Sequence, residues 1–226
     1  MAFNDDSFIR EVNDELRSDQ MKGAWRRFGV YLISLAVIIV LGTAGMVFYR
    51  YWQSNRSSDM SDKFFSALTL ADQKKTDEAL AALDNIAKEG NGGYSALARM
   101  REASIKADKG DTAGALQIFQ AIAKDTDIPQ TLRDFAHLRA GWLLVDNGTY
   151  EQVSAEVEDM AAPSRPHRNS AREILGVAAY RAGNFAQARQ WFQSIVDDAE
   201  AGGVANRARI MLDNINASGK APAAQG

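Results

Sequence analysis

Apolar and polar residues follow two different patterns along this chain. The segment from Phe28 to Tyr49 contains no charged residue, and arginines stand on both sides of it. A helix of this length spans about 30 Å, which matches the hydrocarbon core of a lipid bilayer. Beyond this segment, apolar residues recur at helical spacing among polar ones. The pattern therefore predicts one transmembrane helix over residues 28–49 and a helical domain after it.

Two other interpretations of the uncharged segment are a buried core helix and a cleaved signal peptide. Its length and its charged flanks disfavour a core helix of a soluble protein. A signal peptide has an apolar core of only about 7–15 residues, followed by a cleavage site with small residues. Here 27 residues precede the segment, six of them acidic, and no such site follows it. We therefore interpret the segment as a retained membrane anchor.

Basic residues on the two sides of the anchor predict its orientation. Residues 1–27 carry five Lys and Arg residues, whereas residues 50–58 carry two. Because cytoplasmic flanks are enriched in Lys and Arg, we expect a cytoplasmic N-terminus. In a Gram-negative bacterium the C-terminal domain would then lie in the periplasm and the anchor in the inner membrane. The residues expected at the membrane interface are Arg26, Arg27, Arg50, Tyr51 and Trp52.

The cytoplasmic tail, residues 1–27, is expected to contain a short amphipathic helix. Phe8, Val12 and Leu16 recur every four residues and form a narrow apolar stripe. This stripe fits either a helix that lies against the lipid or the anchor, or a docking helix for a membrane complex. On the other side of the anchor, residues 50–58 form a polar, serine-rich connector.

Residues 59–216 repeat a pattern of two helices. Equivalent positions in the four copies lie 36, 38 and 35 residues apart, at Ala79, Ala115, Val153 and Ala188. A period near 34 residues is typical of tetratricopeptide-type helix pairs, which bury their apolar faces only when several pairs stack. We therefore predict an all-α fold, with the anchor followed by a tetratricopeptide-like α-solenoid of about four helix pairs. A helix from about Gly203 to Asn216 would cap the stack, and residues 217–226 would form a disordered tail.

Each repeated position has a physical role. Small residues seven positions before the turn let the two helices of a pair approach closely, at Ala67, Ala103, Gly141 and Gly176. A glycine followed by Asp or Asn lets the first helix end in a left-handed conformation. The second helix then carries an apolar stripe, at Leu83, Phe119, Val157 and Phe192 and at Ile86, Ile122, Met160 and Ile195.

The third copy diverges most from this pattern. It lacks the alanine and the aromatic residue of the regular copies, and Pro163 and Pro166 exclude a helix directly after it. We expect an irregular bend or a looser joint between the third and fourth pairs.

Composition and motifs argue against several classes of function. The domain after the anchor is close to neutral in a chain of net charge −3, which disfavours a nucleic-acid partner. Cysteine is absent, which excludes thiol catalysis and Cys-ligated metal sites. His137 and His167, the only histidines, lie in no metal-ligand spacing, and no phosphate-binding glycine motif occurs. We expect no catalytic site, cofactor, metal or small-molecule substrate.

Aromatic residues are the candidates for a protein-binding surface. Tyr94, Trp142 and Tyr180 lie in the repeat region. Such residues either pack between helices or line the concave groove of the stack, where they would hold a segment of a partner protein.

The order of these parts resembles a known family. The sequence Tyr49-Arg-Tyr-Trp-Gln-Ser54 follows the anchor directly, and the repeats contain LARMREASIKADKGDTAGAL and AAYRAGNFAQARQWF. These features resemble the ancillary subunit of the bacterial SecYEG translocon, a tetratricopeptide family also grouped with the repeat domain of the cell-division coordinator. The opening FIREVNDELRSDQMKGAWRRFG is similar to alphaproteobacterial members of that group.

This resemblance implies a non-enzymatic inner-membrane adaptor that faces the periplasm. It would link polypeptides emerging from the translocon to periplasmic chaperones, including a membrane-anchored, prolyl-isomerase-like one. Two alternatives stay open. The chain would otherwise be a scaffold for another envelope complex, such as cell division or cytochrome maturation, or a self-associating structural membrane protein.

Overall fold

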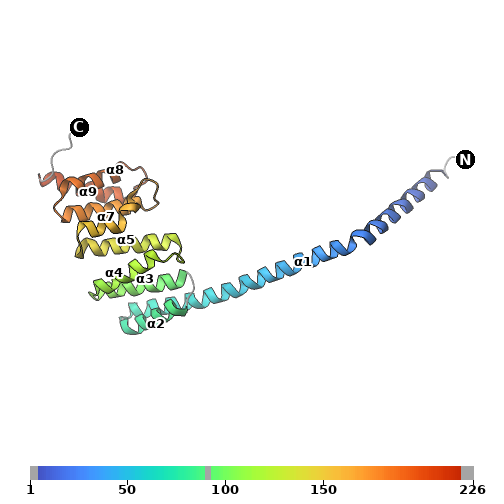
Figure 1. The fold of residues 1–226 in the computed structure, drawn as a ribbon, viewed down its shortest axis with the longest axis horizontal. Helices are drawn as coiled ribbons and strands as arrows, with labels where there is room; N and C mark the ends of the chain where they lie inside the picture. Colours follow the sequence, from blue (N-terminus) through green and yellow to red (C-terminus); the bar gives the residue numbers. More distant parts are fainter. Residues whose placement is uncertain (1–4, 90–92, 220–226) are drawn as a thin grey trace. The chain divides into compact units, whose positions relative to one another are not determined.

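The computed structural model describes residues 5–89 and 93–219 (Figure 1). This description leaves out the side chains of residues 5–28, 32, 36 and 52–57. The apolar stripe of the tail and the predicted interface residues Arg26, Arg27 and Trp52 are therefore outside it. In the described part every regular element is a helix, which confirms the all-α prediction. The chain divides into two compact units, Met1–Asp59 and Met60–Gly226.

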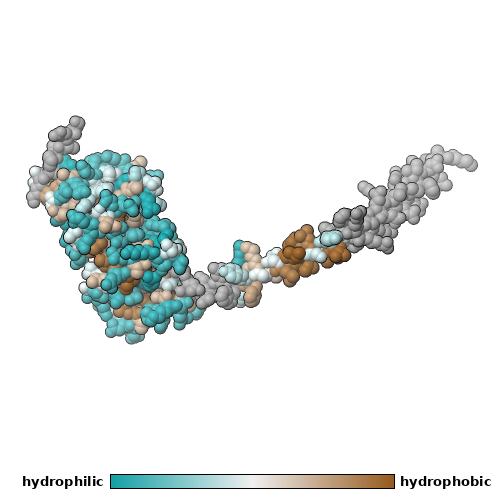
Figure 2. Space-filling view, viewed as in Figure 1, coloured by the Kyte–Doolittle hydropathy of each residue, from teal (hydrophilic) through white to brown (hydrophobic). Residues whose placement is uncertain are grey.

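Helix α1 (Asp5–Asp72) contains the predicted anchor. Its segment Gly29–Tyr51 is apolar enough and long enough to cross a membrane, and the apolar band is visible on this helix in Figure 2. Arg50 and Tyr51 are exposed at the end of this segment. Residues 50–58, predicted as a polar connector, are helical and belong to α1, because a serine-rich stretch without Gly or Pro does not interrupt a helix.

The second unit is a stack of helix pairs. The end of α1 pairs with α2 (Thr76–Glu89), and α3 (Gly93–Asp108) pairs with α4 (Thr112–Lys124). Next come α5 (Gln130–Asn147) with α6 (Tyr150–Val157), and α7 (Arg168–Arg181) with α8 (Phe185–Val196). Helix α9 (Gly203–Ala217) packs on α8 and ends the stack, as the sequence predicts.

The predicted apolar positions form the interior of this unit. All eight stripe residues of the second helices are buried. A Cβ atom added to Gly141 would come within 2.7 Å of Val157 Cγ1, and one on Gly176 within 2.8 Å of the Phe192 ring. The small residues therefore do permit close approach of the paired helices.

The turns of the second and fourth pairs follow the prediction of a left-handed glycine. In the first pair a lysine takes the same conformation, and the third pair departs from it. Lys74, Gly110 and Gly183 occupy equivalent positions and have φ values of 62°, 87° and 78°. Gly148 stands at the same position but is extended, with φ −120°. Helix α5 ends at Asn147, directly before Gly148, whereas α3 and α7 end two residues before their glycines.

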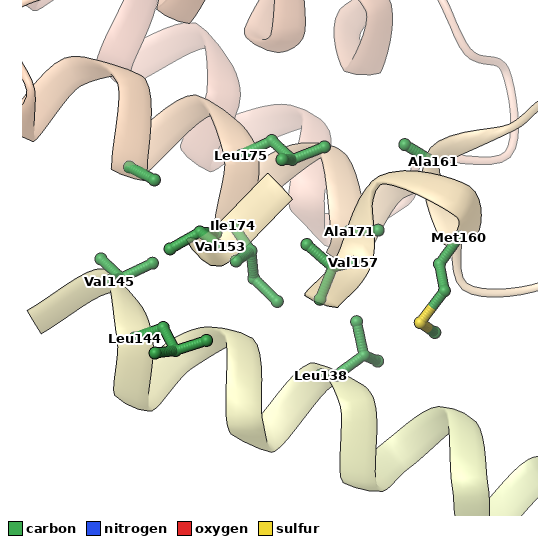
Figure 3. Close-up of a cluster of buried hydrophobic side chains, with 11 residues drawn as sticks. Leu138, Leu144, Val145, Val153, Val157, Met160, Ala161, Ala171, Ile174 and Leu175 are labelled. Carbon is green, nitrogen blue, oxygen red and sulfur yellow. The ribbon is translucent and has the colours of Figure 1, made fainter. Parts of the chain in front are cut away.

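The joint after the third pair is irregular, as predicted, but it is not loose. Helix α6 has only eight residues and continues as a 3₁₀ turn, η1 (Glu158–Ala161). Met160 and Ala161 of η1 join Val153 and Val157 in a core between α5 and α7 (Figure 3). Of the two predicted alternatives, the structure shows the irregular bend and not the looser joint, because side-chain packing replaces the missing helical turns.

Polar groups also hold this joint. Arg172 is buried and donates hydrogen bonds to the carbonyl oxygens of Ala161 and Ser194, each at 3.1 Å. Asp198 accepts two hydrogen bonds from Arg168, at 2.5 and 2.9 Å. The bidentate bond from Arg168 and a backbone N–H hold the pKa of Asp198 well below its usual range.

Candidate protein-binding surface

The first helices of the pairs are the end of α1, α3, α5 and α7. Equivalent positions on these helices are found by counting from the small residue of each pair, which is Ala67, Ala103, Gly141 or Gly176. Leu97 and Phe135 both stand six positions before that residue, and Trp142 stands one after it. Their exposed fractions are 36%, 43% and 37%, which is unusual for large apolar side chains inside a packed domain.

These residues lie on α3 and α5, two helices that a contact between Arg139 and Ser104 links. We call the set Leu97 and Met100 on α3 with Phe135, Arg139 and Trp142 on α5 the aromatic–arginine patch. Residues 135, 139 and 142 have i, i+4, i+7 spacing and therefore share one face of α5. Arg139 reaches α3, where its Nη2 atom lies 3.5 Å from the hydroxyl oxygen of Ser104. Figure 2 shows apolar surface in this part of the repeat unit.

Of the three predicted binding residues, the structure exposes one. Trp142 lies in the aromatic–arginine patch. Tyr94 is half-buried against Phe64, with ring centroids 6.1 Å apart, and Tyr180 is half-buried edge-on against Phe185 at 5.2 Å. The sequence reasoning did not select Leu97, Phe135 or Arg139. Their shared position relative to the small residue was the available signal.

A second regular feature is a basic residue four positions before the small residue of each pair. Each one bonds to an acidic residue at or beyond the second helix of its own pair, and we call these bonds the pair clamps. In three pairs the acidic partner lies 26 positions later: Lys63–Glu89 at 3.3 Å, Arg99–Asp125 at 3.2 Å and Arg172–Asp198 at 3.2 Å.

The third pair clamp is different. Its basic residue is His137, whose Nδ1 lies 2.7 Å from Glu156 Oε1, only 19 positions later. Because α6 is short, the chain has left the helical path before the usual acidic position. Burial alone would raise the pKa of Glu156, but hydrogen bonds with His137 and Gln120 and the nearby charge of Lys124 outweigh it and lower the pKa.

Among the described residues, no three metal-binding side chains lie close enough together to hold a metal ion. Two cavities flank Tyr150, whose hydroxyl oxygen accepts hydrogen bonds from Gln187 at 2.8 Å and Trp191 at 3.1 Å. Burial raises the pKa of Tyr150. Arg181 beside it is bonded to Asp146 at 2.9 Å, and neither histidine lines these cavities, so the polar groups there have structural partners.

A comparison of the sequence with known protein families supports the assignment of the helix pairs as tetratricopeptide-like repeats. The model of a tetratricopeptide repeat-like domain matches residues 22–217. The chain belongs to this tetratricopeptide repeat-like family. A repeat stack with an exposed patch and an anchor fits a membrane-anchored, protein-binding adaptor, and it points to a non-catalytic role.

Among curated proteins, the chain is similar to the ancillary SecYEG translocon subunit of Escherichia coli (strain K12). The two are 29% identical over 129 residues. The similar segment covers 55% of this tetratricopeptide repeat-like chain and 61% of the relative, which is less than two thirds of its length. No solved structure shows significant similarity to the chain.

Proposed function

We propose that this protein is a non-enzymatic adaptor of the Sec translocon that binds other proteins through its repeat unit. Its N-terminus lies in the cytoplasm, α1 crosses the inner membrane, and the repeat unit faces the periplasm. There it links polypeptides emerging from the translocon to periplasmic chaperones. Similarity to the translocon subunit of Escherichia coli supports the translocon as partner. The excess of Lys and Arg before the anchor supports the orientation.

The observation that carries the binding role is the exposure of Leu97, Phe135 and Trp142 on α3 and α5. Large apolar and aromatic side chains on a surface are costly in water and mark sites where another protein covers them. Tethering by the anchor raises the local concentration of the repeat unit beside a membrane complex. Individually weak contacts then suffice for association.

The test is crosslinking in intact cells, followed by purification of the tagged full-length protein in mild detergent and mass spectrometry. The proposal predicts recovery of translocon subunits together with a periplasmic chaperone. Recovery of only cell-division or cytochrome-assembly proteins would favour the scaffold alternative. Recovery of the tagged protein crosslinked only to an untagged copy of itself would favour a self-associating structural protein.

The orientation is tested separately by protease added to the periplasmic side of spheroplasts. A periplasmic repeat unit is cleaved there, while an epitope placed before residue 28 stays protected. Protection of the repeat unit with cleavage of the N-terminal epitope would reverse the proposed topology.

A further inference from the structure

A series of arginines connects successive first helices of the repeat unit. Arg101 on α3 reaches back to Asp72 of α1 at 3.9 Å, and Arg181 on α7 reaches back to Asp146 of α5 at 2.9 Å. Arg207 on α9 makes two bonds with Glu173 of α7, at 2.6 and 2.7 Å. Each of these arginines therefore meets a carboxylate of the preceding helix.

Arg139 on α5 makes no such ion pair among the described residues. It nevertheless occupies the same position in its pair as Arg101. Asp108, which corresponds to Asp72, is exposed and lies beyond ion-pair distance. Arg139 instead contacts the Ser104 hydroxyl at 3.5 Å, and its guanidinium lies 5.8 Å from the centre of the Phe119 ring.

The surroundings of Arg139 are those of a binding site. Phe135 and Trp142 flank it on one face of α5 with exposed fractions of 43% and 37%, and the Phe135 ring also contacts His167, with ring centroids 5.0 Å apart. Protein interfaces are enriched in aromatic residues and arginine, which supply most of the binding energy. A guanidinium with hydrogen-bond donors to spare binds a carboxylate with a planar, bidentate geometry.

We propose that the aromatic–arginine patch binds a segment of a partner protein that carries apolar anchors and one carboxylate, with the carboxylate on Arg139. The apolar anchors cover Leu97, Phe135 and Trp142, and the carboxylate completes the series of arginine–carboxylate pairs. This inference rests on the proposed adaptor function and names the chemistry of the partner.

Charge complementarity selects this partner over a purely apolar one. An apolar segment that covered the patch would remove water from Arg139 without giving it an anion, and that desolvation opposes binding. A basic segment would add repulsion to this cost. An acidic and apolar segment gains from both parts of the patch.

The experiment uses the full-length protein in nanodiscs of zwitterionic lipid and an array of peptides of about twelve residues. Each peptide has an apolar sequence with a single Glu, and its matched partner has Gln at that position. We expect the wild-type protein to prefer the Glu member of the best-binding pairs by about tenfold or more, as one hydrogen bond to a charged group requires.

Three variants separate the role of Arg139 from the effect of losing any arginine and from the effect of losing an apolar contact. Arg139→Gln should remove the preference for Glu while apolar binding persists. Arg181→Gln, which changes an arginine already paired with Asp146, should leave the preference unchanged. Trp142→Ala should weaken binding of Glu and Gln peptides alike. Thermal melting followed by circular dichroism verifies that each variant is folded.

Equal binding of Glu and Gln peptides by the wild-type protein would overturn the inference, as would the absence of any binding. Equal effects of Arg139→Gln and Arg181→Gln would overturn it too. These results are independent of the copurification experiment. Acidic-peptide preference without translocon recovery would refute the proposed translocon role alone, and translocon recovery without that preference would refute only the patch chemistry.

Discussion

The second and third helix pairs have the same plan and reach it by different means. In the second pair, a left-handed glycine turns the chain into a 13-residue helix α4, and Phe119 fills the core. In the third pair, an extended Gly148 leads into the eight-residue α6, and the 3₁₀ turn η1 supplies Met160 to the core. The two pairs therefore share the pattern of buried apolar positions, although the lengths of their second helices differ.

The same contrast extends to the pair clamps. In the second pair an arginine takes the basic position, and Arg99 Nη1 lies 3.2 Å from Asp125 Oδ2. In the third pair, His137 takes the basic position and meets a carboxylate that lies closer in sequence. Its neighbours on α5, Phe135, Arg139 and Trp142, form most of the aromatic–arginine patch. The most divergent pair thus carries the candidate binding surface.

The largest effect is expected from truncating the aromatic core residue of the regular pair. Phe119→Ala should lower the free energy of unfolding by about 3–5 kcal/mol, because Phe119 is fully buried and the truncation leaves a cavity. Val157→Ala in the third pair removes fewer atoms and should cost less. Chemical denaturation of the full-length protein in detergent, followed by circular dichroism, measures both. A smaller effect of Phe119→Ala than of Val157→Ala would contradict the comparison.

The next effect concerns the close approach of α5 and α6. Gly141→Ala should destabilise the repeat unit by about 1–3 kcal/mol, because its Cβ would lie 2.7 Å from Val157. The second pair carries Ala103 at this position without strain. The double variant Gly141→Ala with Val157→Ala should recover part of the loss, as a shared contact requires. Full additivity of the two substitutions would refute the contact.

The turns give smaller effects of opposite sign. Lys74 adopts a left-handed conformation that glycine adopts more readily, so Lys74→Gly should stabilise the protein by about 0.5–1 kcal/mol. Gly110→Ala at the equivalent turn should destabilise it by about 1 kcal/mol, since its φ is 87°. Melting temperatures of the two variants measure this contrast. A shift in the same direction for both would mean that the turn conformation does not control stability.

The smallest effect is the pH dependence of the third pair clamp. The pKa of Glu156 is lowered in the folded protein, so its contribution to stability is present above its unfolded-state pKa and is lost as the pH falls through the folded-state value. Glu156→Gln should therefore reduce the loss of melting temperature between pH 7 and pH 4. Exposed Glu158→Gln on η1 is the matched control. Equal acid sensitivity of the two variants would contradict the assignment.

Periodicity in the sequence was sufficient to predict the helix pairs, the buried stripes and the small residues. These features depend on local spacing and on burial of apolar side chains, which a sequence displays directly. The continuous helix across residues 50–58 was missed because serine and asparagine are weak helix formers but do not end a helix. The extended Gly148 was missed because a glycine permits both conformations, and the length of α5 decides between them.

The binding surface was only partly predictable. Trp142 was identified from its residue type, but Phe135 and Leu97 required knowledge of which helix positions stay exposed in the folded stack. The unpaired state of Arg139 depends on distances between α5 and α3, which no single-sequence pattern contains. Tyr94 and Tyr180 were equally plausible by residue type, yet both are half-buried against other aromatic rings.

The most direct test of the account places a photo-crosslinking aromatic residue at position 142 of the full-length protein in living cells. The matched control carries the same residue at position 117, an exposed site on the second helix α4. The account predicts crosslinks to partner proteins from position 142, their loss in the Arg139→Gln background, and few from position 117. Equal crosslinking from both positions, or crosslinks from position 117 alone, would show that the aromatic–arginine patch is not the binding surface.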